Sequence, residues 1–259
     1  MTQGRVAVVS GASAGIGEAV ARELTKRGWR CVLLARRQER LEPLAAELGG
    51  EWEVCNVRDR AEVEEVAARV LERHPEIGLL VNNAGVPGRG TFVSTEPETI
   101  ERVIETNYLG GVWCSRAFLP GLRAAAPDAH IVNVVSVAGT IAFAPAGPYA
   151  AAKHAQLAFS RSLTATLRRE GIFVHALIPG FVETEGFRPR TTLKNPLMRR
   201  FVIEPDAVAK AIVDAVEKNR GEVTIPWFPY RLATIAQVLM PGLVGRVSRR
   251  FGYRSWVQD

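Results

Sequence analysis

Seven short runs of apolar, largely β-branched residues recur along the chain, and segments with helical periodicity fill the intervals between them. The runs lie at 5–10, 30–35, 51–56, 77–84, 130–136, 172–178 and 222–225. Most of them are continuously apolar rather than alternating, which is the pattern of parallel strands that are buried on both faces of a sheet. The sequence therefore predicts seven strands in a parallel sheet.

Helical periodicity lies between these runs, at about 15–28, 37–49, 59–73, 97–124, 149–170 and 205–218. Asp59 and the pair Pro205-Asp206 stand where two of these helices begin, as residues favoured at helix starts. Strands and helices that alternate over short connections predict an α/β fold, a Rossmann-type doubly wound parallel sheet with helices on both faces. No Pro-, Gly- or Ser-rich linker divides the chain, so we expect residues 1–259 to form a single domain.

Two segments interrupt this alternation. Residues 180–203 follow the sixth strand without a clear period, and loops at the carboxyl ends of parallel strands commonly cover ligands, so we expect a substrate loop there. Residues 226–259 form an apolar and basic extension that Pro241 interrupts. The extension could cover the substrate pocket, pack against a neighbouring subunit, or lie on an anionic membrane surface. The first two alternatives are favoured equally over the third.

Composition excludes several classes of protein. The net charge is +6, but the basic residues are scattered and no nucleic-acid-binding motif occurs, so no nucleic-acid partner is expected. The three cysteines, Cys31, Cys55 and Cys114, and the four histidines show no metal-ligand spacing, so no metal is expected. No apolar run approaches the roughly 20 residues of a membrane span, and none near the N-terminus resembles a signal peptide. We therefore expect a cytoplasmic protein.

A glycine-rich segment, SGASAGIGEAV, follows the first predicted strand and leads into the first helix. Gly11, Gly15 and Gly17 stand in the spacing G-x-x-x-G-x-G. Glycine allows a sharp turn and a close approach of backbone N–H groups to a phosphate, and the start of the helix directs its positive dipole end to the same point. The segment predicts a dinucleotide-binding loop.

The end of the second predicted strand indicates which dinucleotide is bound. A free ribose 2′-hydroxyl usually meets Asp or Glu at this position, whereas a 2′-phosphate requires positive charge. The chain has Ala35-Arg36-Arg37 there, two guanidinium groups without a carboxylate. We therefore expect NADP(H) to be preferred over NAD(H).

Five further features follow in a fixed order. They are NNAG from Asn82, NYLG from Asn107, Ser136 at the end of the fifth strand, YAAAK from Tyr149 to Lys153, and PGFVET from Pro179. Together with the glycine loop they resemble the short-chain dehydrogenase/reductase family of the Tyr-xxx-Lys type, over about residues 4–225. Ser10 stands where the family more often has Thr, and Asn56 stands where it commonly has Asp.

The resemblance implies an enzyme that transfers a hydride between NADP(H) and a carbonyl or secondary alcohol. Tyr149 would be the general acid in reduction and the base in oxidation. Bringing a phenol from a pKa near 10 close to neutrality takes about 4 kcal/mol, much of which Lys153 could supply from the same helix face. Lys153 would also hold the nicotinamide ribose, Ser136 would donate a hydrogen bond to the substrate carbonyl, and Asn107 would position Lys153 through water.

The same resemblance implies a set of cofactor-binding residues. The phosphates would meet Gly11, Ser13, Ala14, Gly15, Ile16 and Gly17, and the 2′-phosphate would meet Arg36 and Arg37. The adenosine would meet Asn56, Val57, Asn83, Ala84 and Gly85. The carboxamide end would meet Pro179, Gly180, Val182 and Thr184.

The substrate pocket would be formed by residues 137–148, 86–92 and 180–203. The first of these segments is apolar, which favours a lipophilic ketone or alcohol as the substrate. Arg188, Arg190 and Lys194 could instead attract an anionic carrier, which would make the protein a 3-oxoacyl-thioester reductase. A non-catalytic NADP-binding sensor or scaffold is a third alternative, although such proteins typically lose the tyrosine or the lysine. The family resemblance further implies a homodimer or homotetramer.

Overall fold

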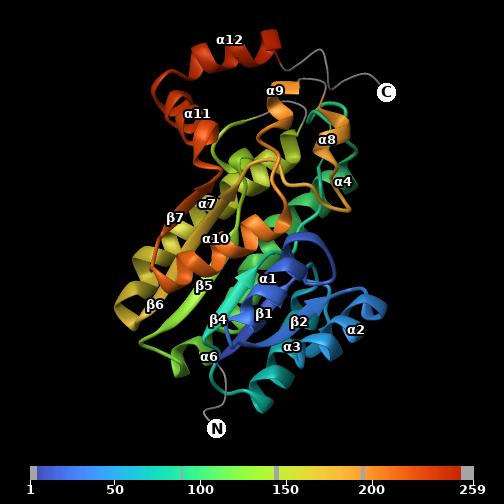
Figure 1. The fold of residues 1–259 in the computed structure, drawn as a ribbon, viewed down its shortest axis with the longest axis vertical. Coiled ribbons are helices and arrows are strands. Elements are labelled where there is room, and N and C mark those ends of the chain that lie inside the picture. Colours follow the sequence, from blue (N-terminus) through green and yellow to red (C-terminus); the bar gives the residue numbers. More distant parts are fainter. Residues whose placement is uncertain (1–4, 89, 143–145, 194–195, 252–259) are drawn as a thin grey trace.

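The computed structural model describes residues 5–88, 90–142, 146–193 and 196–251. Its centre is one seven-stranded sheet in the order β3-β2-β1-β4-β5-β6-β7, in which every neighbouring pair is parallel (Figure 1). The strands are β1 (Val6–Ser10), β2 (Arg30–Ala35), β3 (Glu51–Val54), β4 (Leu79–Asn82), β5 (Ala129–Val134), β6 (Ile172–Pro179) and β7 (Glu222–Ile225). The Rossmann-type doubly wound sheet predicted from the sequence is confirmed.

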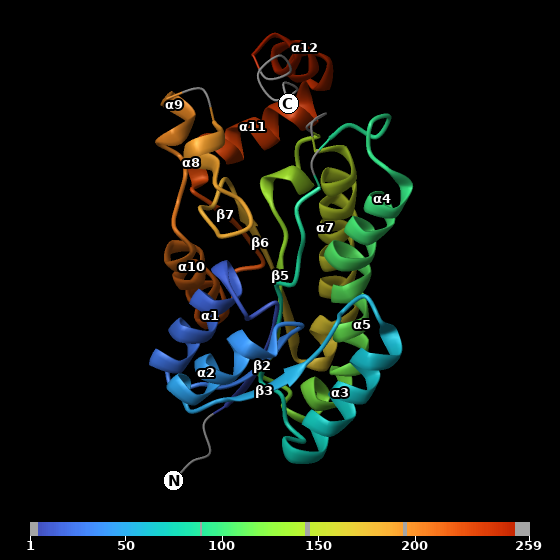
Figure 2. The same ribbon diagram turned by 90° about the vertical axis from the view of Figure 1, so that its right-hand side faces the viewer.

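Helices cover both faces of this sheet, as Figure 2 shows. One face carries α1 (Gly15–Lys26), α2 (Gln38–Leu48) and α10 (Pro205–Glu217), whose apolar residues form one core with the sheet. The other face carries α3 (Arg60–Arg73), α5 (Gly110–Ala117), α6 (Leu119–Ala124) and α7 (Gly147–Leu167), which enclose a second core. The apolar strands are thus buried on both sides, as their continuous hydrophobic pattern requires.

The long helix predicted over 97–124 is divided. It consists of α4 (Pro97–Ile104), a π-helical turn η1 (Glu105–Leu109), α5 and α6. Within the turn, the Thr106 hydroxyl donates to the carbonyl of Arg102 and the Asn107 amide donates to that of Val103, so side chains compete with the backbone for helical acceptors. Pro120 lies in the first turn of α6, where a residue without an N–H separates it from α5. The helical periodicity of hydrophobic residues in the sequence does not reveal where this helix is interrupted.

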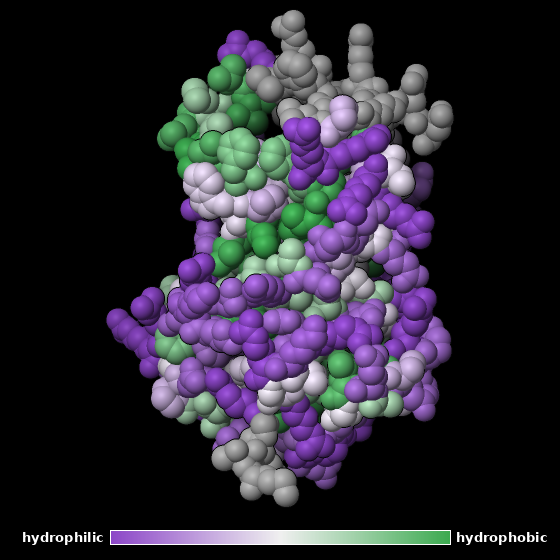
Figure 3. Space-filling view, viewed as in Figure 1, coloured by the Kyte–Doolittle hydropathy of each residue, from purple (hydrophilic) through white to green (hydrophobic). Residues whose placement is uncertain are grey.

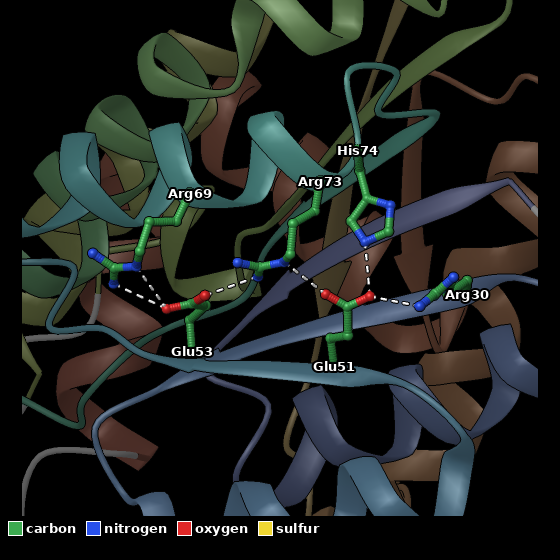
Figure 4. A network of polar contacts seen from close by, with 6 residues as sticks. All are labelled: Arg30, Glu51, Glu53, Arg69, Arg73 and His74. Atoms are coloured by element: carbon green, nitrogen blue, oxygen red, sulfur yellow. Dashed lines mark hydrogen bonds and ion pairs between the residues drawn. The ribbon is translucent and has the colours of Figure 1, made fainter.

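The edge strand β3 is protected by charge. Glu51 and Glu53 on β3 accept hydrogen bonds at 2.8–3.1 Å from the guanidinium groups of Arg69 and Arg73 on α3, and Glu51 also contacts His74 and Arg30 (Figure 4). Exposed pairs of this kind contribute little stability singly. They place charged side chains along an edge that could otherwise pair with another strand.

The segments after β6 gather at the carboxyl end of the sheet. The predicted substrate loop contains two single-turn helices, α8 (Pro189–Thr192) and α9 (Pro196–Arg199). After β7 come α11 (Trp227–Leu239) and α12 (Pro241–Phe251), at the top of Figure 1. Tyr230 of α11 is buried against Phe181, and the Thr234 hydroxyl bonds with that of Thr140 at 2.9 Å. One face of α11 therefore covers the segment that follows β5. Among the described helices, none is long and apolar enough to cross a bilayer.

Candidate functional site

The glycine loop packs against the segment after β4 at distances that only glycine allows. Gly11 has a left-handed φ of 67°, and a Cβ there would lie 2.7 Å from the Cα of Ala84. A Cβ on Gly17 would lie 2.2 Å from the carbonyl oxygen of Gly11. Helix α1 then begins at Gly15 after Ala14, whose methyl group cannot cap it. The first-turn N–H groups and the helix dipole therefore suit a bound phosphate, and this loop fits a dinucleotide.

Ser10 and Asn83 join the ends of β1 and β4 beneath this loop. The Ser10 hydroxyl donates to the carbonyl of Val81 and accepts from the backbone N–H groups of Asn83 and Ala84, at 3.1–3.2 Å. The Asn83 amide donates to the carbonyls of Ser10 and Gly11. Serine thus supplies the hydroxyl that the family more often takes from threonine, and the Asn83 side chain holds the loop itself.

We expect the replacement Gly17→Ala to destabilise the fold and weaken dinucleotide binding. The new methyl group would collide with backbone rather than with a flexible side chain, and overpacking of this kind costs about 1–3 kcal/mol. Gly221→Ala is the matched control, because a Cβ there meets nothing within 4 Å and its φ is not left-handed. Chemical denaturation of both variants and NADPH titration measure the effect. Equal stability of the two variants would contradict the close approach.

Basic residues surround the end of β2. The Arg37 guanidinium donates to the Ser13 hydroxyl at 3.1 and 3.2 Å, which places it directly on the glycine loop, and Arg36 beside it is exposed. Arg37 and Arg40 each lie 3.7 Å from the carboxylate of Glu185 in the loop after β6. These two ion pairs are solvent-exposed and therefore weak. The arrangement fits a 2′-phosphate at the glycine loop.

Ser136 and Tyr149 meet at the carboxyl end of β5. Ser136 begins a short turn, where its hydroxyl accepts from the backbone N–H of Ala138 at 3.1 Å. Tyr149 lies in the first turn of α7 and is half-buried, and Gly88 packs against it so closely that a Cβ would lie 3.1 Å from the tyrosine Cβ. Burial raises the pKa of Tyr149, whereas a hydrogen bond with the Ser136 side chain lowers it. The two hydroxyl groups therefore lie next to each other.

Lys153 is buried one turn further along α7, with a side-chain ammonium group that points inward. Its Nζ donates to the carbonyl of Val134 and to Oε1 of Gln156, both at 2.8 Å, and lies 5.7 Å from the centre of the Tyr149 ring. Burial lowers the pKa of Lys153 to about 7. Close to neutral pH this group thus changes charge beside Tyr149, as a proton-transfer site requires.

Asn107 binds the segment after β4. Its amide nitrogen donates to the carbonyls of Val86 and Val103 at 2.9 Å, and its Oδ1 accepts from the N–H of Val86 at 3.2 Å. A Cβ on Gly85 would lie 2.7 Å from that oxygen. The direct contacts of Asn107 therefore fix the backbone of the short segment after β4, against which Tyr149 packs. The π-helical turn is the local geometry that brings the Asn107 side chain to this segment.

Gln156 contacts Lys153 in the candidate site, although the sequence motifs do not include it. It lies three residues after Lys153 on the same face of α7, so the i, i+3 rule for helices could have indicated it. Behind it, Asn133 bridges Asn82 and Ser160 at 2.9 Å. Oδ1 of Asn82 is the one buried side-chain polar atom without a partner in the part of the chain that the structure describes. A buried polar network thus extends from Lys153 into the core.

The remaining predicted cofactor residues also lie around the carboxyl end of the sheet. Asn56 lines a shallow hollow of about 400 Å³ together with Arg58 and Glu105, and Val57 packs against Gly110. Thr184 lies over Gly15, and Gly180 lies under the ring of Tyr230. Ile16 packs against the core, while Pro179 ends β6 and Val182 is buried. Lys194 lies outside the described residues.

Another cavity, of about 310 Å³, lies at the opposite end of the sheet. It is lined by residues that precede strands, among them Arg5, Trp29 and Asp128. Ligands of doubly wound sheets bind at the carboxyl ends of the strands, where the predicted catalytic and cofactor residues converge. This second cavity is therefore not the candidate site.

Comparison with known proteins gives concordant matches. A profile of the family described as short chain dehydrogenase matches residues 5–194. The chain is 38% identical to a Streptomyces coelicolor protein named as a ketoacyl reductase, over 69% of this chain and 71% of that one. It is 32% identical to dehydrogenase/reductase SDR family member 7B of Danio rerio, over 95% and 84%. An actinorhodin polyketide ketoreductase crystallised with NADPH superposes with a TM-score of 0.78 at 29% identity, over 87% of this chain and 97% of that one.

Proposed function

This chain belongs to the short-chain dehydrogenase family and is an oxidoreductase of that type, and we propose that it reduces a lipophilic ketone, or oxidises the corresponding alcohol, with NADP(H). The observation that carries the proposal is that Ser136, Tyr149 and Lys153 lie together at the carboxyl end of the sheet, where the glycine loop also lies. The bound dinucleotide would supply or accept the hydride.

The side chains of this chain would move the proton and stabilise the charge. In reduction, the Tyr149 hydroxyl would give its proton to the carbonyl oxygen, while the Ser136 hydroxyl would donate a hydrogen bond to the same oxygen. Lys153, when protonated, would stabilise the phenolate that forms. Asn107 would act by fixing the segment after β4, against which Tyr149 packs. In oxidation the same groups would act in the opposite order.

The preference for NADP(H) would depend on the arginines at the end of β2. Arg36→Asp should raise the Michaelis constant for NADPH by about tenfold to a hundredfold, because a phosphate-binding cation is replaced by an anion. The constant for NADH should change little. Arg116→Asp on α5 is the control, since it makes the same charge change on a remote exposed surface. An unchanged NADPH constant in Arg36→Asp would refute this part of the proposal.

A lipophilic substrate is supported by the pocket segment after Ser136. Val137, Ala138 and Ile141 are buried there, and α11 lies over Thr140. A 3-oxoacyl thioester is the second candidate, because one relative is named as a ketoacyl reductase. The carrier of such a thioester needs positive charge, and the Arg190 guanidinium shares its charge with the carboxylate of Glu204 at 2.6 Å, whereas the buried side chains after Ser136 are all apolar. We therefore place the lipophilic ketone first.

A panel of aliphatic ketones, steroid-like ketones and 3-oxoacyl thioesters, followed by NADPH absorbance, tests these alternatives. We expect turnover that requires Tyr149 and is faster with the lipophilic ketones. A preference for the thioesters would reverse the order of the two substrates. NADPH binding without turnover of any compound would favour a sensor or scaffold. We also propose a homodimer or homotetramer, which light scattering would distinguish from a monomer.

A further inference from the structure

Helix α11 has two faces of opposite character. Tyr230 and Thr234 lie on the inner face, where they contact Phe181 and Thr140. Leu232, Ile235 and Leu239 lie on the other side, in the i, i+3, i+7 spacing of one helical face, and all three are exposed. We call this second surface the outer apolar face. Leu239 is 72% exposed, although it is one of the most hydrophobic side chains of the helix.

The exposed apolar surface extends to both ends of the helix. Val238, Met240 and Leu243 are exposed at the connection to α12, and Trp227 and Phe228 are exposed at the start of α11. Figure 3 shows a hydrophobic area where α11 lies and α12 begins. Soluble chains seldom leave so many large apolar side chains together in water, and a concentration of this kind marks a binding surface.

The charge of the segment identifies the occupant. The extension, residues 226–259, contains five arginines, namely Arg231, Arg246, Arg249, Arg250 and Arg254, and a single acidic side chain, Asp259. Within this segment Arg246 of α12 is exposed next to the apolar surface. An apolar face with arginines and aromatic residues beside it is the pattern of helices that lie in the headgroup region of an anionic bilayer. A second copy of the chain fits less well, because a two-fold contact through this face would bring Arg246 of the two copies together.

We propose that the outer apolar face, with Arg246 of α12 beside it, docks on the surface of an anionic lipid bilayer, with α11 lying in the plane of the interface. The inner face of α11 covers the segment after Ser136, so the bilayer would lie about one helix diameter, some 10 Å, from the substrate side. This binding requires no span and is independent of whether the site turns over a ketone. Of the three alternatives for the extension, this proposal assigns pocket cover to the inner face and lipid contact to the outer face.

Sedimentation with vesicles tests the proposal on the full chain. We expect binding to vesicles of phosphatidylglycerol and phosphatidylcholine in equal parts, weaker binding at high salt, and little binding to pure phosphatidylcholine. The triple variant Leu232→Gln, Ile235→Gln, Leu239→Gln should bind to these vesicles with an affinity that is lower by roughly tenfold or more. Val93→Gln, which removes an apolar side chain that is 98% exposed elsewhere, should bind like the wild type. Arg246→Gln should weaken binding roughly fivefold, whereas Arg116→Gln should not.

Two further measurements separate this proposal from its competitors. Thermal melting and turnover of a water-soluble ketone check that the triple variant is folded, and neither should change much. A wild-type chain that stays in solution with anionic vesicles would overturn the proposal, as would equal vesicle binding by the triple variant. A lipid-free oligomer that the triple variant dissociates, with no vesicle binding by either protein, would assign the face to a second copy instead. If the wild-type chain turns over no ketone, the vesicle assay still tests this proposal, because lipid binding does not depend on catalysis.

Discussion

Replacing Tyr149 with phenylalanine should lower kcat for ketone reduction by about 10²–10⁴-fold while leaving NADPH affinity nearly unchanged. Phenylalanine keeps the Cβ and the backbone that pack against Gly88, and it keeps the aromatic ring, but it lacks the hydroxyl that faces Ser136. Removing a positioned general acid typically has an effect of this size, because the proton must then come from water. The Michaelis constant for the ketone should change much less than kcat.

Tyr108→Phe is the matched control for this experiment. The Tyr108 ring lies edge to face with Phe159, at 6.2 Å between ring centres, and takes no part in the proposed proton transfer. Steady-state kinetics of both variants with the same ketone and NADPH give the comparison. Turnover of the Tyr149 variant within a few-fold of the wild type would remove that phenol from the mechanism.

The second large effect is expected at Lys153. Lys153→Met keeps the length of the buried side chain but removes the charge that would stabilise the phenolate. The loss of most of about 4 kcal/mol of anion stabilisation corresponds to a fall of roughly a thousandfold in kcat. In the wild type, kcat/KM for NADPH should fall as the pH rises above about 7, because Lys153 then loses its proton. A wild-type profile that is flat through this range would contradict the assignment.

The same substitution should change the pH dependence of stability. The pKa of Lys153 is about 7 in the fold and 10.5 without burial, so the unfolded chain binds more protons between these values. Wild-type stability attributable to this group therefore rises from pH 7 to pH 10.5, by up to about 5 kcal/mol, and is constant below and above that window. Lys153→Met should lack this rise. Denaturation curves at several pH values measure the difference, and parallel curves for the two proteins would contradict the burial of a titrating lysine.

The sequence predicted the strands better at their starts than at their ends. The runs that ended at Asn56, Ala84 and Ser136 were predicted to remain in the sheet, but β3, β4 and β5 end two residues earlier. The apolar pattern continues through Cys55 and Val135, which are buried and whose N–H groups still donate to the neighbouring strands, whereas the residues that follow them leave the sheet. The N–H of Asn56, for example, donates to the carboxylate of Glu62. The residues that leave the sheet are those that form the site.

The motifs also indicated which residue types converge, but not how they are bonded. Spacing placed Tyr149 and Lys153 on one helix face, as observed. It could not show that Nζ of Lys153 donates to Val134 and Gln156, because the carbonyl comes from β5 and depends on tertiary packing. Likewise, the apolar extension was visible in the sequence, whereas the exposure of one face of α11 depends on what the rest of the chain covers. Local patterns predict elements, and the contacts between distant elements remain to be seen in the structure.

The central claim is that Tyr149 carries the proton and that Lys153 stabilises its anion, and the pKa of this phenol in the complex with NADP⁺ tests it most directly. The chain has four tyrosines, so ¹³Cζ-labelled tyrosine gives few NMR signals, and Tyr149→Phe identifies the relevant one. In the protein without dinucleotide, burial should keep the pKa of Tyr149 above 10. The account predicts that in the complex it falls well below 10, and that Lys153→Met abolishes the fall. A phenol that still titrates at or above 10 in the wild-type complex would contradict the account.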